Sequence, residues 1–273
     1  MRVLITGGTG LLGRALVRTA VGAGHAVRVL SRRARAAADG FEYAVGDVAS
    51  GAGLDAALSG VEAIIHAASD PRRPEEVDVG GTRRLVEAAC TAGVAHLVYV
   101  SIVGIDRIPV RYYRTKLEAE GIVAASGLPH TVLRATQFHA FVAWLISGAA
   151  RVPFVLPLPA GFKFQPVDEA EVAEQLVRCL GEGPRGRADD FGGPEVLSLE
   201  EMAEAWMEAT GVRKRMLRLP VPGALAAALR GGANTAPDGE RGSVSWREWL
   251  ARNVGRARGP AGRQQESPRP ASG

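Results

Sequence analysis

The chain has 273 residues, of which 47% are hydrophobic and 23% are charged, a composition typical of a globular protein with a sizeable buried core. The formal net charge of +4 is modest, and no basic stripe alternates with aromatic residues, so nucleic acid is not an expected partner. No apolar run approaches the roughly 20 residues that span a bilayer, so no membrane is expected either. The length fits one large α/β domain or a domain with a smaller appendage.

The cysteines and histidines do not indicate a metal site. Cys90 and Cys179 lie in apolar stretches that are expected to be helical, so two buried small residues are expected instead of a disulfide or a metal pair. The 5 histidines are scattered without metal-ligand spacing. The chain starts with a strand-like run and not with a leader, which favours a cytoplasmic protein. A monomer or a homodimer is expected.

The first stretch, MRVLITGGTGLLG, combines a strand, a glycine-rich turn and the start of a helix. Gly7 allows a sharp turn off the strand, Gly10 lets a pyrophosphate approach the backbone, and Gly13 lets the helix pack closely on the sheet. The N-terminus of the helix offers N–H groups to a phosphate. The residues expected to hold the cofactor here are Gly7, Thr9, Gly10, Leu11, Leu12 and Gly13.

The end of the second expected strand, His25 to Ser31, carries no acidic residue. In a dinucleotide-binding βαβ unit an acid at this position hydrogen-bonds the ribose 2′-hydroxyl, whereas Arg and Ser would bind a 2′-phosphate. Ser31 and Arg32 occupy it here, so the sequence favours NADP(H) over NAD(H). The alternative is a solvated basic turn.

Two further strand ends supply candidate cofactor contacts. Asp47 and Val48 follow a strand at residues 41–45, where Asp47 could meet the adenine amino group or cap the next helix, and Val48 could pack on the ring. The small residues Ala67 and Ala68 follow the fourth strand and leave room for the cofactor. His66, at the end of that strand, is interpreted as a hydrogen-bonded structural histidine and not as a catalytic base.

Strands alternate with helices along the first half of the chain. Helical patterns at residues 75–92 and 111–126 separate the strands expected at 61–66, 96–101 and 130–134, the last of which is expected to complete the series. This alternation predicts a doubly wound, parallel α/β sheet. The later chain reads as a small, mostly helical lobe. Asp168, and Ser198 with Glu201, are expected to cap two of its helices.

A Ser, a Tyr and a Lys are expected to meet near the end of the fifth strand. Tyr112 and Lys116 are four residues apart on one expected helix and share a face, and Ser101 ends the preceding strand. Such a group can move a proton: the lysine lowers the pKa of the tyrosine, the tyrosine exchanges the proton, and the serine holds the substrate oxygen. Tyr113 is a rival for Tyr112, and packing roles for both tyrosines are the alternative.

Together these segments resemble the extended and atypical short-chain dehydrogenase/reductases, and most of all their NmrA-like, NAD(P)H-binding branch. The similarity rests on the glycine turn, Ser31-Arg32, Gly46-Asp47-Val48 and Tyr112-x-x-x-Lys116, and extends to the segments 133–138 and 165–173. The resemblance implies a Rossmann domain with a small C-terminal substrate lobe and an NADP(H) cofactor whose ribose Lys116 also contacts. It places Gln137 and Phe138 near the substrate.

The expected organisation is an NAD(P)-binding Rossmann domain at residues 1–150, a small substrate lobe partly interwoven with it at 151–253, and a disordered tail at 254–273. The leading hypothesis is an NADP(H)-dependent oxidoreductase acting on a small carbonyl, quinone or related apolar molecule, in an apolar pocket near residues 138–159. An NAD(P)-binding, redox-sensing regulatory protein without turnover and a nucleotide-sugar epimerase or dehydratase are the alternatives.

Overall fold

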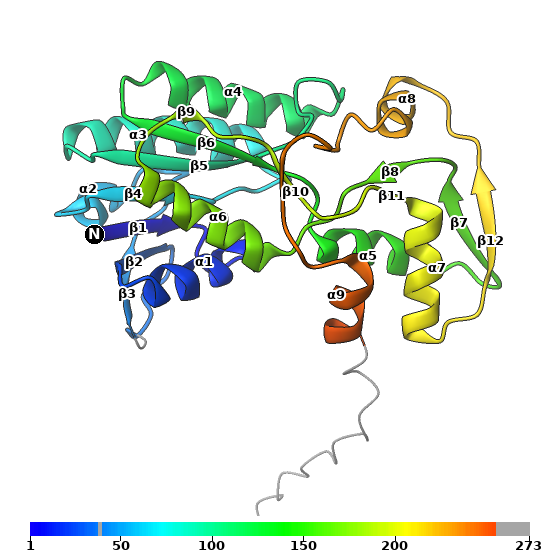
Figure 1. The fold of residues 1–273 in the computed structure, drawn as a ribbon. Coiled ribbons are helices and arrows are strands. Elements are labelled where there is room, and N and C mark those ends of the chain that lie inside the picture. Colours follow the sequence, from blue (N-terminus) through cyan, green and yellow to red (C-terminus); the bar gives the residue numbers. More distant parts are fainter. Residues whose placement is uncertain (38–39, 255–273) are drawn as a thin grey trace, which may run out of the picture.

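A parallel β-sheet forms the centre of the protein (Figure 1). The computed structural model describes residues 1–37 and 40–254. Six strands lie in the order β6–β5–β4–β1–β2–β3, and this order, with helices on both faces, confirms the expected doubly wound Rossmann fold. In chain order they are β1 (Arg2–Thr6), β2 (Ala26–Ser31), β3 (Phe41–Val45), β4 (Ala63–His66), β5 (His96–Ile102) and β6 (His130–Ala135).

The sheet continues beyond β6 with three short strands from the second half of the chain. They are β9 (Gly186–Arg187), β10 (Phe191–Gly192) and β13 (Glu240–Arg241). β9 and β10 both pair with β6, and β13 pairs with β10, all in parallel. The expectation that the sixth strand completes the sheet was therefore wrong. Strands of two residues are too short to show the alternation by which a strand is recognised in a sequence.

Helices cover both faces of the sheet. On one face, α1 (Leu11–Gly22) packs against α6 (Glu169–Glu182), and on the other lie α2 (Leu54–Leu58), α3 (Gly81–Thr91) and α4 (Arg111–Ala125) (Figure 1). Successive residues of β1 serve the two faces in turn, because side chains alternate along a strand. Val3 and Ile5 are buried in the cluster with α1 and α6, and Leu4 in the other.

The helix expected at residues 75–92 begins with a π-helical turn, η1 (Glu75–Gly80), and continues as α3. A π-helix has a wider hydrogen-bond spacing than an α-helix and is frequent at functional sites. Here the turn places the side chain of Asp78 in the protein interior, where only 1% of the residue is exposed. The π-helical turn therefore buries an acidic residue, which the helical pattern of the sequence alone does not predict.

The C-terminal lobe, which lies beside the sheet domain in Figure 1, has its own apolar core. It contains the helices α5 (His139–Ala149), α7 (Leu199–Thr210), α8 (Ala224–Arg230) and α9 (Trp246–Asn253), with the paired strands β7 (Val155–Pro159) and β12 (Arg215–Leu219), and β8 (Lys163–Phe164) and β11 (Leu197–Ser198). The expected caps are confirmed: Asp168 accepts a hydrogen bond from the backbone N–H of Ala170, and Ser198 and Glu201 form a capping box.

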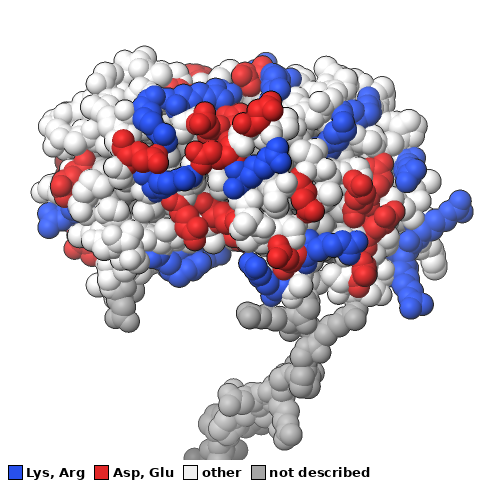
Figure 2. Space-filling model, viewed as in Figure 1, with Lys and Arg blue, Asp and Glu red and all other residues white. Residues whose placement is uncertain are grey.

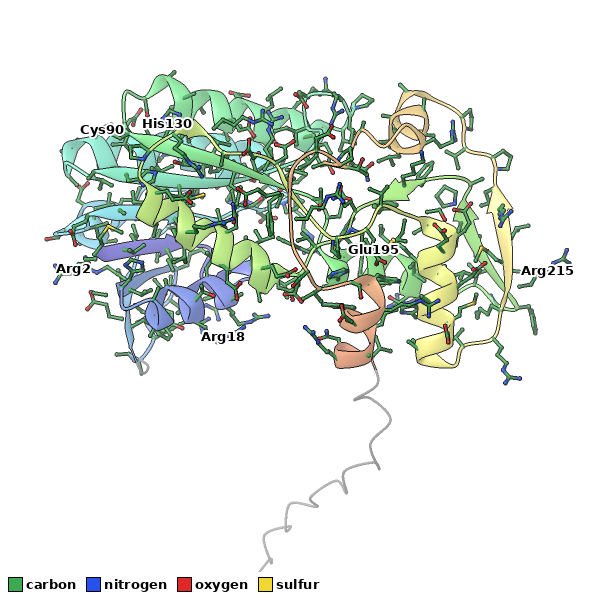
Figure 3. All side chains as sticks on the ribbon, viewed as in Figure 1. Arg2, Arg18, Cys90, His130, Glu195 and Arg215 are labelled. Atoms are coloured by element: carbon green, nitrogen blue, oxygen red, sulfur yellow. The ribbon has the colours of Figure 1, made fainter. Side chains whose placement is uncertain are left out.

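The surface is mixed in character. Lys and Arg side chains alternate with Asp and Glu over the face seen in Figure 2. Cys179 is buried in α6, but Cys90 is exposed on α3 (Figure 3), so the expectation of two buried cysteines was wrong for Cys90. Its neighbour Ala89 holds the buried position on that helix. Among the described residues, no helix is both long and apolar enough to cross a bilayer. Residues 255–273, which make up nearly all of the expected disordered tail, lie outside the described residues.

Candidate active site

The glycine-rich turn connects β1 to α1 and leaves no room for a side chain at Gly7 or Gly13. Gly7 has a φ angle of +71°, and a Cβ atom on it would lie 2.5 Å from the carbonyl oxygen of Ala67. A Cβ atom on Gly13 would lie 2.0 Å from the carbonyl oxygen of Gly7. Gly10 begins α1 without a side-chain cap, and a Cβ atom there would meet only the oxygen of Gly7, at 3.2 Å. The first N–H groups of α1 are thus accessible to a ligand that approaches Gly10.

A pocket of about 740 Å³ lies at the carboxyl ends of β1, β2 and β4, beside this turn. Ligands of open α/β sheets bind at this edge of the strands. Of the residues expected to hold a cofactor, nine line the pocket: Gly7, Thr9, Gly10, Ser31, Arg32, Asp47, Val48, Ala67 and Ala68. Leu11, by contrast, is exposed on α1, Leu12 is buried in the core, and Gly13 acts through packing.

Arginines surround the end of β2. Arg32, Arg33 and Arg35 line the pocket, and Arg73 from the loop after β4 joins them. The hydroxyl of Ser31 donates to the backbone oxygen of Arg33 at 2.9 Å and thereby fixes the turn that carries these arginines. The glycine turn and the arginines fit a dinucleotide with phosphate groups, because both supply donors to anions.

Asp47 also contributes through its backbone turn. Its carboxylate accepts a hydrogen bond from the N–H of Ala49 at 3.0 Å. The expectation that Asp47 could cap the following helix was wrong, because α2 begins after Gly53. The loop between Asp47 and Gly53 is closed by backbone hydrogen bonds, such as Gly51 N–H to the oxygen of Asp47 at 2.8 Å. Asp47 therefore shapes the wall of the pocket.

A second pocket, of about 460 Å³, lies between the N-terminal end of α4 and the C-terminal lobe. It is the apolar pocket that the sequence predicts near residues 138–159. Its lining is Ile108, Val110, Tyr112, Tyr113, Gln137, Phe141, Leu145, Ile146, Ala149, Pro157, Leu158, Pro159, Phe162, Phe164, Leu199, Leu225, Leu229 and Asn234. Gln137 is thus at this site, whereas Phe138 is half-buried and packs against the core under α1 and α6.

One hydrogen bond joins the two pockets. The hydroxyls of Ser69, which lines the first pocket, and Tyr112, which lines the second, are 2.7 Å apart. Burial raises the pKa of Tyr112 to about 12, although the hydrogen bond with Ser69 opposes the shift. Tyr112 is therefore a protonated hydroxyl at neutral pH, placed where the contents of both pockets would meet.

Lys116 shares a helix with Tyr112 but has other partners. Its Nζ donates to the hydroxyl of Tyr99 at 2.5 Å and to the backbone oxygen of Val100 at 3.1 Å, and lies 3.8 Å from a carboxylate oxygen of Asp78. Burial lowers the pKa of Lys116 to about 8, against the attraction of Asp78. The structure does not support the expectation that Lys116 lowers the pKa of Tyr112.

Comparison with known proteins places this geometry in a family. Residues 7–182 match the model of the NAD(P)H-binding family. The chain belongs to this NAD(P)H-binding family. The matched residues include the glycine turn, the lining of the first pocket from Gly7 to Val77, and α4. The match confirms the resemblance to the atypical short-chain dehydrogenase/reductases.

Two relatives are reductases. The (4-alkanoyl-5-oxo-2,5-dihydrofuran-3-yl)methyl phosphate reductase of Streptomyces griseus is 31% identical over 233 residues, which are 83% of this chain and 80% of that protein. The NAD(P)H azoreductase of Xenophilus azovorans is 31% identical over 216 residues, 77% of this chain and 74% of that protein. The chain is thus a NAD(P)H-binding protein of oxidoreductase type.

A solved structure shows the same fold. The NADPH-dependent quinone oxidoreductase of Escherichia coli, complexed with NADPH, aligns with a TM-score of 0.73 at 22% sequence identity, over 92% of this chain and 99% of that one. At this identity the likeness concerns the fold alone. The two proteins therefore share their overall fold, which includes the C-terminal lobe as well as the Rossmann sheet.

In this NAD(P)H-binding protein the structure keeps Ser101 apart from the two pockets. Ser101 lies within β5, only 3% of it is exposed, and its hydroxyl has no hydrogen-bond partner among the described residues. It lines neither pocket in the part of the chain that is described. The hydroxyl that meets Tyr112 belongs to Ser69, at the end of the neighbouring strand.

Four residues at or near the site were not expected from the sequence as polar partners: Ser69, Asp78, Tyr99 and Asn234. Tyr99 is fully buried in β5, and burial followed by the charge of Asp78 raises its pKa well above the usual value. A tyrosine in an apolar strand reads as a core residue. The position of Ser69, three residues after the end of β4, is the one signal that could have identified it.

The close packing at Gly13 leads to a testable result for the family's glycine turn. We expect Gly13→Ala to destabilise the protein by about 1–3 kcal/mol and to weaken NADPH binding, because the new methyl group must push α1 away from Gly7. Thermal unfolding and NADPH titration measure both effects.

The matched control for this substitution is Gly22→Ala at the other end of α1. A Cβ atom there meets nothing within 4 Å, so this variant should be at least as stable as the parent protein. Equal behaviour of the two variants would show that the contact between Gly13 and Gly7 is unimportant.

Proposed function

We propose that the protein is an NADP(H)-dependent reductase of an apolar carbonyl or quinone compound. The observation that carries the proposal is the hydrogen bond between Ser69 and Tyr112, which joins the dinucleotide pocket to the apolar pocket. The reductase relatives support an oxidoreductase activity for the combined site.

In this proposal the dinucleotide lies along the first pocket. Its pyrophosphate meets the N–H groups that follow Gly10, and its adenosine end lies near Val48 and the arginines after β2. The cofactor, when bound, supplies a hydride for a substrate carbon. The apolar pocket excludes water from the substrate, which strengthens the electrostatic interactions within the site.

Tyr112 is the proposed proton donor. Its hydroxyl is protonated at neutral pH, as tyrosine ordinarily is, and burial raises its pKa from 10.0 to about 12. It can give this proton to the substrate oxygen, on which negative charge develops as the hydride is transferred. The hydroxyl of Ser69 can then donate a hydrogen bond to the phenolate that remains on Tyr112. Lys116 is proposed as a positioning residue, since Asp78 and Tyr99 hold it in the interior beside the fifth strand.

The preference for NADP(H) rests on the arginines around Ser31. No acidic residue lies at the end of β2, and Arg32, Arg33 and Arg35 all line the pocket. A 2′-phosphate would form charge-assisted hydrogen bonds there, each of about 1.5–3 kcal/mol. Such contacts distinguish NADPH from NADH, which lacks the phosphate.

Replacing Arg32 should therefore act on one cofactor only. We expect Arg32→Ala to weaken NADPH binding about tenfold or more and to leave NADH binding nearly unchanged. Fluorescence titration of each cofactor measures this, and Arg72→Ala, which removes an exposed arginine outside the pocket lining, is the matched control. If the parent protein bound both cofactors equally well, the preference for NADPH would be refuted.

Turnover is tested with a panel of quinones, aldehydes and ketones and NADPH. The proposal requires that at least one apolar member support NADPH oxidation. Tight NADPH binding without oxidation across the panel would instead favour the redox-sensing regulator among the alternatives.

A further inference from the structure

The apolar pocket beside Tyr112 has two unlike ends. Phe141 and Leu225 are 45% and 42% exposed and form its rim, whereas Asn234 and Gln137 are 1% and 8% exposed and belong to its buried part. The remaining lining is almost entirely apolar. A polar pair in the buried part of an apolar cavity fixes the orientation of a ligand.

The orientation of the Asn234 amide is determined by its neighbours. Its Nδ2 donates to the backbone oxygen of Lys163 at 2.8 Å and to Oε1 of Gln137 at 3.3 Å. The Nε2 of Gln137 donates in turn to the backbone oxygen of Asn234 at 3.0 Å. Because both carbonyl oxygens can only accept, neither amide can be turned over without losing these bonds.

This arrangement leaves one polar atom without a partner. Oδ1 of Asn234 is buried and has no hydrogen-bond partner within the described residues. A buried acceptor that lacks a partner destabilises the free protein, so a ligand that brings a donor to it binds more tightly. A ligand that presents only an acceptor there would be repelled.

The exposed rim is apolar beyond what the pocket needs. The Phe141 ring stacks on the ring of Trp144, with centroids 6.0 Å apart, and 66% of Trp144 is exposed. Both belong to α5, whose other side packs Val142 and Ile146 into the lobe core. An apolar surface thus continues outward from the mouth of the pocket.

We propose that this pocket takes an amphiphile with a hydrogen-bond donor at one end and an alkyl chain at the other. The donor, a hydroxyl or N–H group, pairs with Oδ1 of Asn234, and the chain leaves past Phe141 and Leu225 along Trp144. The proposal rests on the assignment of this pocket as the substrate site, and it makes the substrate an alkylated carbonyl compound that carries a hydroxyl or N–H group.

Binding of two matched probes tests the buried end without any turnover. Calorimetry compares 4-hexylphenol, a donor, with 4-hexylanisole, whose ether oxygen only accepts. Partition into an apolar cavity would favour the anisole. We expect the phenol to bind about tenfold more tightly. Equal affinities, tighter binding of the anisole, or no binding of either probe would overturn the proposal.

Variants separate the two ends of the pocket. We expect Asn234→Leu to abolish the preference for the phenol, and Phe141→Ala to keep that preference but to reduce the gain in affinity from 4-ethylphenol to 4-hexylphenol. Phe154→Ala is the control, because Phe154 is 90% exposed and lies outside this pocket. An unchanged preference in a folded Asn234→Leu variant, or an unchanged chain-length gain in Phe141→Ala, would contradict the proposal.

The comparison of the two probes in the parent protein holds even if Asn234→Leu does not fold. Thermal unfolding identifies that case. None of these measurements requires NADPH oxidation, so a lack of reductase activity would refute the proposed function and leave the binding result to be judged separately.

Discussion

Removal of the Tyr112 hydroxyl should leave the protein folded but nearly inactive. We expect Tyr112→Phe to lower kcat/KM with NADPH and a quinone substrate by about 100-fold or more, the usual contribution of a positioned proton donor. The substitution removes only the hydroxyl that lies 2.7 Å from that of Ser69. NADPH affinity, measured by fluorescence, should stay within a few-fold of the parent value.

Tyr113→Phe is the matched control. Tyr113 is the next residue on α4 and lines the same apolar pocket, and its ring lies beside that of Tyr112 with centroids 6.2 Å apart. Ser69 is bonded to Tyr112 and not to Tyr113. We expect Tyr113→Phe to retain kcat/KM within a few-fold. Equal losses in the two variants would mean that neither hydroxyl is the specific proton donor.

Acid should destabilise the protein through His66, which lies at the end of β4 next to the dinucleotide pocket. Burial, and then the charge of Lys116, lowers the pKa of His66 from its usual 6.5 to about 3. Between these values the unfolded chain binds a proton at this histidine and the folded protein does not, so the free energy of unfolding falls as the pH falls. The full difference corresponds to about 5 kcal/mol at about 1.4 kcal/mol per pKa unit.

Urea unfolding of the parent protein and of His66→Gln between pH 7 and pH 4 measures this contribution. The variant should lose less stability over this range than the parent, because it has no proton to take up at position 66. His130→Gln controls for the general effect of replacing a histidine. Parallel pH dependences of the parent and His66→Gln would rule out the assigned role of His66.

A chain of hydrogen bonds satisfies both ring nitrogens of the buried, neutral His66. Thr82 Oγ1 donates to the backbone oxygen of Asp78, so Nε2 of His66 donates to Thr82 at 2.9 Å. Nδ1 is then the acceptor for the hydroxyl of Thr6, at 2.6 Å, and that hydroxyl accepts from the N–H of Ala68 at 3.2 Å. A second proton on the ring would reverse the Thr6 bond in the wall of the dinucleotide pocket. The interpretation of His66 as a hydrogen-bonded structural residue agrees with these contacts.

The sequence predicts the sheet well where local patterns are strong. The strand at residues 41–45 has the expected bounds. Gly7 and Gly13 pack closely, as expected, and Gly10 leaves the backbone accessible to a ligand. The strand and the contact of Gly13 with Gly7 depend on residues that are close together in the chain. Helical spacing also correctly placed Tyr112 and Lys116 on one helix, α4.

The polar partners in the interior were not predictable in the same way. Lys116 meets Tyr99 and Asp78, and Tyr112 meets Ser69, through contacts between elements that helical spacing does not describe. The carboxylate of Asp78 comes from the π-helical turn η1, whereas Lys116 lies on α4. Local propensity does not encode such contacts between elements, so the partners of Lys116 could not be predicted from its own helix.

Because the chain is made from its N-terminus, the outer edge of β6 is exposed to incorrect strand pairing before its own partners exist. β6 ends at Ala135, but its sheet partners β9 and β10 begin only at Gly186 and Phe191, and β13 begins only at Glu240. During synthesis the backbone groups on the outer edge of β6 therefore stay unpaired while tens of further residues are added. The strands of other nascent chains could pair with this edge in the meantime. Severing the chain after the first half would make this exposure permanent, so the two halves should accumulate in soluble form only when they are produced together.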